Sequence, residues 1–236
     1  MNKYLSTTVL LPTKNHEDII KREINKLLIF MDSNFVDYEI LVVSNGSEEQ
    51  KINMLNDEVF SHSNINVKIL EKLGKGNAVK WGLQNSKFNK VIIFDSDFSY
   101  DLNIIHKFFH NSKPLSSFIY AERQLNKKII NTTPKLRLIA GYIFNFIVRR
   151  YFKISINDTQ AGLKFIDLNE FKNAANFLNE GYLYDIELFL LAEKSKIEIS
   201  KVKVFEINTN FESNISIFSD SLIMLKNLKQ IKKRYS

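Results

Sequence analysis

The chain has 236 residues, no cysteine and a formal net charge of +7. The lack of cysteine excludes a disulfide scaffold, a thiolate metal site and a cysteine nucleophile. Apolar residues make up 44% of the chain, with only 7 Gly and 3 Pro, which favours one compact domain over a disordered or linker-rich chain. The positive charge favours an anionic partner, such as nucleic acid, anionic lipid or a phosphorylated ligand.

Short apolar runs alternate with helical patterns in the first half of the chain. We predict strands at 7–11, 38–43, 66–70 and 91–94, with an amphipathic helix after the first strand and a helix over 75–86 after the third. Ser47 and Gln50 have the spacing of a capping box at the start of the helix that follows the second strand. This alternation indicates βαβ units and a mostly parallel sheet flanked by helices.

The second half is less regular. We predict strands at 117–121, 163–166 and 199–205, and helices at 134–152, 184–196 and from 219 onward. The predicted organisation is a single α/β domain over 1–210 followed by a basic helical tail over 211–236. The basic residues of this tail are Lys226, Lys229, Lys232, Lys233 and Arg234.

The longest apolar stretch runs from 138 to 152 and is interrupted by Asn145, Arg149 and Arg150. It is shorter than the ~20 apolar residues that a membrane-spanning helix needs. One interpretation is a core helix. The interpretation we favour places the helix 137–152 in the plane of a membrane surface, with its basic end and the basic tail toward anionic headgroups.

Two carboxylates, Asp95 and Asp97, directly follow the apolar strand at 91–94. Open α/β sheets bind ligands at the carboxyl ends of their strands, and two close carboxylates favour a cation between them. A divalent metal that carries substrate phosphates meets that need. Taken alone, the same residues also fit an ordinary Asx-turn after a strand.

The order of several polar turns narrows the choice. A Val-Leu-Leu-Pro-Thr start at residue 9, Asn-Gly-Ser at 45, Gly-Lys-Gly-Asn-Ala-Val at 74, Asp-Ser-Asp at 95 and Asp-Thr-Gln-Ala-Gly-Leu-Lys at 158 follow one another along the chain. This series resembles family 2 glycosyltransferases of the GT-A fold, and within them the polyprenyl-phosphate sugar synthases, such as dolichyl-phosphate mannose or glucose synthases. The resemblance covers roughly residues 7–206.

The resemblance implies an inverting transfer of a sugar from a UDP- or GDP-sugar, with Mg²⁺ or Mn²⁺ as cofactor. The implied metal ligands are Asp95, Asp97 and Ser99. The implied nucleotide-binding residues are Pro12, Thr13, Glu17, Ser44, Asn45, Lys75, Asp95 and Ser96. His16 alters the spacing before Glu17, and Ser44-Asn45 replace the Asp-Asp pair of many relatives, so the choice between uridine and guanosine stays open.

The resemblance also implies catalytic residues and acceptor-binding residues. The catalytic candidates are Asp97, Arg123, Asp158, Gln160 and Asp185. The candidates for the acceptor or its phosphate are Arg123, Arg137, Lys164 and Glu187. Arginine suits such a role because its guanidinium pairs with phosphate in a bidentate manner, whereas the simpler interpretation is a surface salt bridge for the arginines and helix-terminal carboxylates for Asp185 and Glu187.

Three functions therefore remain open at this level. The first is transfer of a sugar to a polyprenyl (dolichyl or undecaprenyl) phosphate by a cytoplasmic protein bound peripherally to the inner face of the membrane, with a membrane-anchoring partner as one possibility. The second is transfer to a hydroxyl of a surface polysaccharide or glycolipid. The third is non-catalytic binding of a nucleotide sugar. Nucleic acid is not expected as a partner, because no recognition motif is present.

Overall fold

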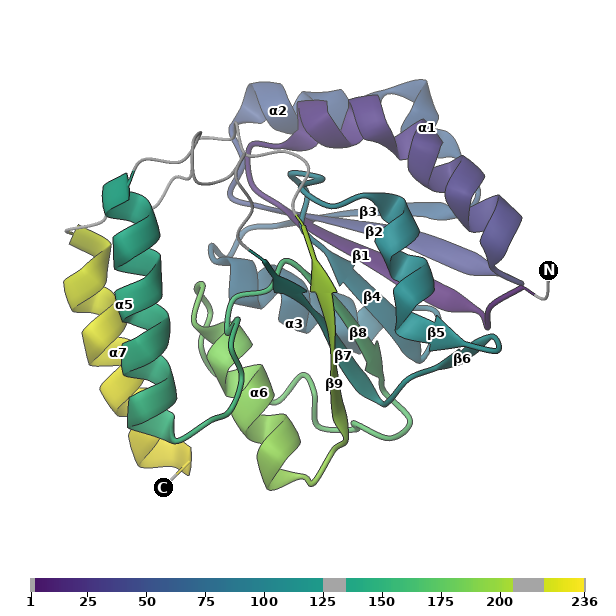
Figure 1. Cartoon of the computed structure of the whole chain (residues 1–236). Coiled ribbons are helices and arrows are strands. Elements are labelled where there is room, and N and C mark those ends of the chain that lie inside the picture. The colour runs from purple at the N-terminus through teal and green to yellow at the C-terminus, as the bar shows by residue number, and fades with distance from the viewer. Residues whose placement is uncertain (1–2, 125–134, 206–218, 236) are drawn as a thin grey trace.

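A computed structural model of the chain describes residues 3–124, 135–205 and 219–235, with side chains over 3–124, 141–205 and 227–235. A seven-stranded sheet in the order β3-β2-β1-β4-β8-β7-β9 forms the centre (Figure 1). Its strands are β1 (Thr7–Thr13), β2 (Tyr38–Asn45), β3 (Ile65–Leu70), β4 (Lys90–Phe94), β7 (Phe118–Arg123), β8 (Leu163–Asp167) and β9 (Ile199–Val204). A small hairpin of β5 (Phe109–His110) and β6 (Lys113–Pro114) stands apart from it.

The sheet is parallel apart from one strand. β1 pairs in parallel with β2 and β4, β2 with β3, and β7 with β9, whereas β8 runs antiparallel to both β4 and β7. The mostly parallel sheet predicted from the sequence is therefore confirmed. Because β8 is reversed, the segment that enters it meets the carboxyl end of β4.

Helices cover both faces of the sheet. The helices are α1 (Glu17–Asn34), α2 (Glu49–Asn53), α3 (Lys75–Asn85), α5 (Lys135–Phe152), α6 (Tyr184–Lys194) and α7 (Ser219–Tyr235), with short 3₁₀ segments at Met54–Asn56, Glu58–Ser61 and Leu102–Phe108. Val9 and Leu11 pack with α1 on one face, while Leu10 packs with α3 and α6 on the other. The alternation of side chains along a strand produces this division.

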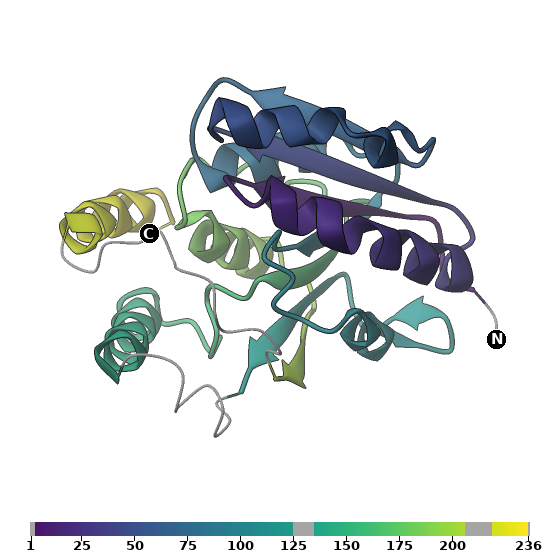
Figure 2. The ribbon, with the colours of Figure 1, turned by 90° about the horizontal axis from the view of Figure 1, so that it is seen from above.

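The helices α5 and α7 lie at one side of the molecule, beyond α6 (Figures 1 and 2). They meet near their carboxyl ends, where Lys232 Nζ donates to the Tyr151 carbonyl at 2.7 Å. Leu228 and Ile231 of α7 are buried in the core on the α6 side. The predicted domain boundary at 210/211 lies outside the described residues. Within the described part of the chain, we find no helix whose length and apolar character would let it cross a bilayer.

Gly82 of α3 allows this helix to approach β1 closely. A Cβ atom at Gly82 would lie 2.3 Å from a Leu10 methyl carbon, and Leu10 is fully buried. Gly141, on α5, has no such restriction, because a Cβ there would meet nothing within 4 Å. The two helical glycines therefore differ in the space around them.

We expect Gly82→Ala to lower the free energy of unfolding by ~1–3 kcal/mol, because the added methyl overpacks the core. Gly141→Ala is the matched control and should raise it by up to ~1 kcal/mol, since alanine is the better helix former. Urea unfolding followed by circular dichroism measures both. Equal effects of the two substitutions would contradict the packing of α3 on β1.

Candidate active site at the carboxyl edge of the sheet

The predicted site residues gather at one edge of the sheet. β1, β2, β4 and β7 all end there, and the segment 158–162 enters β8 at the same edge because that strand is reversed. β2 and β3 lie on one side of β1, and β4 lies on the other side. The direction in which successive strands are added to the sheet therefore changes beside β1. This is the position at which open α/β sheets bind ligands.

Asp95 follows β4 and holds a lysine. The ammonium of Lys75, at the first position of α3, lies 2.7 Å from Asp95 Oδ1 and 2.8 Å from Oδ2. Burial acts to lower the pKa of Lys75, but the carboxylates of Asp95 and Asp185 outweigh it, and the pKa is raised. Lys75 is therefore a positively charged group at the strand end.

Asp97 lies one turn further on and is held by Ser99. The Ser99 backbone N–H donates to Asp97 Oδ1 at 3.0 Å, and the pKa of Asp97 is raised, first by burial and then by the charge of Asp95, against the Ser99 hydrogen bonds. Ser99 is buried. Asp95 and Asp97 thus place two carboxylates at the end of β4, and the Lys75 ammonium already contacts one of them, Asp95. The role of Ser99 as a metal ligand stays a prediction.

Gly162 lets the loop before β8 approach Asp95. The Asp95 N–H donates to the Gly162 carbonyl at 2.9 Å, and a Cβ at Gly162 would lie 2.8 Å from Asp95 Oδ2. The Gly162 N–H in turn donates to the Tyr100 hydroxyl at 3.2 Å. Tyr100 was not among the predicted site residues, and only its place after the Asp-x-Asp segment could have indicated it.

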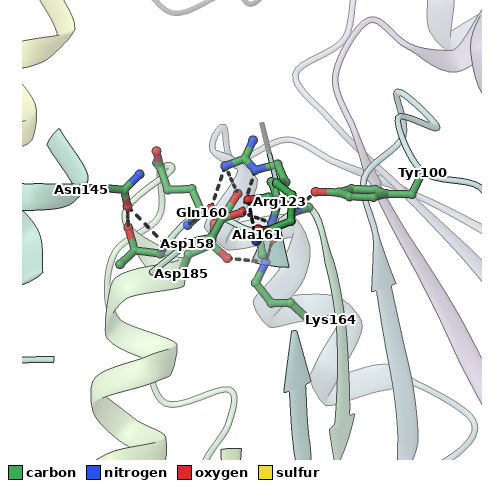
Figure 3. A network of polar contacts seen from close by, with 11 residues as sticks. Tyr100, Arg123, Asn145, Asp158, Gln160, Ala161, Lys164 and Asp185 are labelled. Atoms are coloured by element: carbon green, nitrogen blue, oxygen red, sulfur yellow. Dashed lines mark hydrogen bonds and ion pairs between the residues drawn. The ribbon is translucent and has the colours of Figure 1, made fainter. Parts of the chain in front are cut away.

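Arg123, at the end of β7, forms a bidentate pair with Asp158 (Figure 3). Its Nε donates to Asp158 Oδ2 at 2.7 Å and its Nη2 to Oδ1 at 2.8 Å. Nη2 also donates to the Gln160 carbonyl at 3.1 Å. Burial acts to raise the pKa of Asp158, but Arg123 and the backbone N–H groups of Arg123 and Gln160 lower it overall. The Arg123 side chain remains 37% exposed, so an anionic oxygen can reach it.

Lys164 and Asp185 form a second, deeper pair (Figure 3). Lys164 Nζ lies 2.7 Å from Asp185 Oδ1, and the Lys164 side chain is fully buried. Nζ also donates to the Ala161 carbonyl. The pKa of Asp185 is raised, because burial outweighs the opposing charges of Lys164 and Lys75. Lys164 therefore holds the 158–162 segment against α6, and a direct contact with the acceptor stays a prediction.

The ends of β1 and β2 form a second group, next to the carboxylates. Glu17 is completely buried, and its Oε1 accepts from the hydroxyls of Ser44, at 2.9 Å, and Ser47. The Asn45 amide donates to the Lys72 carbonyl. Three buried oxygens, Thr13 Oγ1, Glu17 Oε2 and Asn45 Oδ1, have no hydrogen-bond partner among the described residues. Unpaired buried oxygens are uncommon and call for a ligand or water.

The capping box predicted at Ser47 and Gln50 is wrong. α2 begins at Glu49, after Glu48, and no side chain caps it. Ser47 instead donates to Glu17 and accepts from the Asn15 N–H at 3.0 Å. A hydrogen bond to a buried carboxylate is charge-assisted and therefore stronger than one to a backbone N–H at a helix start. The Ser47 hydroxyl accordingly donates to Glu17.

The remaining predicted residues lie in different parts of the structure. Pro12 lies near the end of β1, and Ser96 lies between Asp95 and Asp97. The Ser96 hydroxyl is 3.3 Å from His16 Nδ1, a contact that the sequence alone did not indicate. Gln160 is half-buried beside Arg123. Glu187 accepts from the Leu178 and Asn179 N–H groups at 2.8 and 2.5 Å, and its contact with the acceptor stays a prediction. The Arg137 side chain lies outside the described residues.

In the described ranges, no three His, Asp or Glu side chains form a complete metal centre. Asp95 and Asp97 supply two carboxylates, and the ammonium of Lys75 already contacts Asp95. Hard divalent cations that bind through one or two carboxylates take their remaining ligands from water and substrate phosphates. The residues present therefore fit a metal that is shared with a diphosphate.

Residues 8–161 match the profile of glycosyl transferase family 2. The chain belongs to glycosyl transferase family 2. Curated relatives include dolichyl-phosphate beta-glucosyltransferases of Drosophila melanogaster, 27% identical over 85% of this chain and 66% of that protein, and of Dictyostelium discoideum, 26% identical over 99% of this chain and 75% of that protein. The human enzyme of the same name is 26% identical over 97% of this chain and 75% of its own length. This chain thus spans about two thirds to three quarters of these relatives.

Solved structures of other GT-A glycosyltransferases share the fold of this chain. Glucosyl-3-phosphoglycerate synthase from Mycobacterium tuberculosis in complex with UDP superposes with a TM-score of 0.67, at 14% identity over 98% of this chain and 80% of that one. The same enzyme with Mn²⁺ and UDP-glucose gives a TM-score of 0.65 at 15% identity, over 98% of this chain and 79% of that one. The chain is a family 2 glycosyltransferase of the GT-A fold.

We expect Asp158→Asn to lower the free energy of unfolding by ~1–3 kcal/mol at pH 7, because the charge-assisted pair with Arg123 is lost. The pKa of Asp158 is depressed in the folded chain, so its stabilisation is present above the ordinary carboxyl pKa of about 3.9 and is lost as the pH falls through the lower folded value. The difference between variant and wild type should therefore shrink below about pH 4.

Urea unfolding at pH 7 and at lower pH tests this expectation. Asp37→Asn is the control, because Asp37 is about half exposed and lies 3.5 Å from the exposed Lys87, so that substitution should have little effect. A constant difference between Asp158→Asn and wild type across the pH range would contradict the role assigned to the Arg123 pair.

Proposed function

We propose that this glycosyltransferase moves glucose from UDP-glucose to a polyprenyl phosphate, with a divalent cation, Mn²⁺ or Mg²⁺, at Asp95 and Asp97. One observation carries the donor site: three buried oxygens without a partner among the described residues lie at the ends of β1 and β2 and the start of α1, where His16 contacts Ser96 between the two carboxylates. A nucleoside offers N–H and O–H groups to such oxygens. The names of the relatives support glucose and a lipid phosphate, and the UDP-glucose complex of a structural relative supports uridine.

The chemistry needs little beyond positioning and charge. An oxygen of the lipid phosphate attacks C1 of glucose, the new C1–O bond forms, and the bond from C1 to the β-phosphate oxygen breaks with its electron pair leaving on UDP. A phosphate monoester is already anionic near neutrality, so no general base is required. The site fits this demand, because two of its carboxylates, Asp158 and Asp185, are held by cations and are not placed to act as a base.

Positive charge assists the departure of UDP. Lys75 lies against Asp95 and can pair with the diphosphate, and a bound divalent cation would neutralise further charge on the leaving group. Arg123, held in a defined orientation by Asp158 but 37% exposed, is suited to the acceptor phosphate. The acceptor thus approaches from the β7 end of the site, and the donor from the β1–β2 end.

Radiolabelled UDP-glucose, incubated with Mn²⁺ and vesicles that contain undecaprenyl phosphate, should give a product that extracts into organic solvent. Asp97→Asn should lower the rate by roughly 100-fold or more, as the loss of an electrostatic group at a leaving diphosphate does. Asp101→Asn is the control and should keep the rate, since Asp101 is exposed and only accepts from Asn103. Label that stays in water-soluble glycan would support transfer to a hydroxyl and sink the lipid-phosphate proposal.

We also propose that α5 contacts the membrane that holds the acceptor. Its residues Tyr142, Ile143, Phe146 and Ile147 are 75%, 49%, 62% and 38% exposed. Their spacing places them on one face of the helix, while Val148 is fully buried on the opposite face. Arg149 and Arg150 are exposed at the end of this helix. An exposed apolar face with a basic end suits an anionic bilayer surface.

The double substitution Tyr142→Ser with Phe146→Ser should weaken binding to phosphatidylserine vesicles by roughly tenfold or more, because each buried large side chain contributes ~1.5–3 kcal/mol. Ile29→Ser with Val36→Ser is the control, since both side chains are exposed on α1 or just after it. Vesicle sedimentation measures the binding. Equal binding by the two double variants would exclude α5 as the contact.

A further inference from the structure

Lys75 occupies the place that a metal ion would take on Asp95. Its ammonium lies at nearly equal distances from the two carboxylate oxygens, 2.7 and 2.8 Å. A divalent cation on Asp95 would approach the same oxygens to within about 2.0–2.6 Å. Two cations so close repel each other, so the metal and the Lys75 ammonium compete for this carboxylate.

The backbone around Lys75 is closely packed and leaves little room to relieve that conflict. Gly74 has φ +118°, a conformation that favours glycine, and a Cβ at Gly76 would lie 2.2 Å from the Asn179 carbonyl oxygen. The Asn77 N–H donates to the Glu180 carbonyl at 3.3 Å, and Glu187 holds this 179–180 segment from the other side. The loop packs directly on the 179–180 segment, so the side chain of Lys75 is the part that can leave Asp95.

The neighbouring cations are already committed elsewhere. Lys164 is fully buried against Asp185 and the Ala161 carbonyl, and Arg123 is held in a bidentate pair by Asp158. Lys75 differs from Lys164 because its side chain is 24% exposed, and from Arg123 because its flexible stem ends in a point charge that no bidentate pair orients. It is the cation beside Asp95 that can transfer to an incoming anion.

We propose that Lys75 is an internal competitor of the divalent cation: its ammonium neutralises Asp95 until nucleotide binds, and it moves onto the diphosphate when metal and donor arrive together. This inference rests on the proposed metal site at Asp95 and Asp97. Metal alone must displace Lys75 from Asp95 without offering it a diphosphate, and the nearby Asp185 is already paired with Lys164, so metal alone binds weakly. Metal with a nucleoside diphosphate gives Lys75 a new partner, so the two ligands bind cooperatively.

The test is the affinity for Mn²⁺, measured by titration calorimetry or by the electron paramagnetic resonance of free Mn²⁺, with and without UDP. Without UDP, Lys75→Met should bind Mn²⁺ more tightly than wild type, by roughly 5- to 150-fold, the range typical of coupling between two ligands. UDP should tighten Mn²⁺ binding strongly in wild type and much less in Lys75→Met. Because coupling is reciprocal, Mn²⁺ should tighten UDP binding by the same factors.

Two variants separate displacement from a general change in charge. Lys72→Met removes the same charge three residues away, where Lys72 pairs with the exposed Glu180, and should bind Mn²⁺ as wild type does. Lys75→Arg keeps the charge and should retain weak binding of Mn²⁺ alone. Lys75→Gln replaces Lys75→Met if the latter fails to fold, as judged by circular dichroism.

Unchanged or weaker Mn²⁺ binding by folded Lys75→Met or Lys75→Gln would overturn the inference. So would Mn²⁺ and UDP that bind independently in wild type, which is a measurement that needs no variant. If wild type binds no Mn²⁺ even with UDP, the proposed metal site itself fails. If wild type and Lys75→Met bind Mn²⁺ equally well and both lose it in Asp97→Asn, the metal site stands and only the competition fails.

Discussion

The structure depends on one constraint: charged groups buried at the edge of the sheet must each have a partner, because an unpaired buried charge is very costly. Asp95 is met by Lys75, Asp158 by Arg123 and Asp185 by Lys164. These three pairs join the ends of β4 and β7, the loop that enters β8, and the starts of α3 and α6. The fold brings together elements far apart in the sequence, and the pairs fix their relative positions.

A second layer of contacts keeps these pairs in place. Arg234 of α7 lies 3.3 Å from Glu187 Oε1, and Glu187 Oε2 accepts the N–H groups of Leu178 and Asn179. The carbonyl groups of the 179–180 segment lie so close to the two glycines that flank Lys75 that neither position has room for a Cβ atom. The basic carboxyl-terminal helix is thus connected through Glu187 to the active-site lysine. Glu187 supports this segment through these contacts, and its contact with the acceptor stays a prediction.

Much of the site could be predicted because the residues that carry it follow strand ends. Asp95, Arg123 and Asp158 were expected from the sequence, and the structure brings them to one edge of the sheet. What could not be predicted was which carboxylate would take which cation. Ser47 shows the same limit, since its spacing indicated a helix cap, whereas the buried Glu17 takes its hydroxyl. His16 and Tyr100 were missed because their contacts join loops 80 and 62 residues apart.

The sequence by itself determined the alternation of strands and helices, because apolar periodicity reports which side of each element is buried. It also determined the order of polar turns that identifies the family. Only the tertiary structure decided that β8 runs antiparallel, since strand direction depends on long-range pairing and leaves no local pattern. Only the tertiary structure decided, too, that Lys75 lies on Asp95 while Lys164 is sealed against Asp185. A lysine's partner is set by the distance to a carboxylate in space, and the sequence carries no measure of that distance.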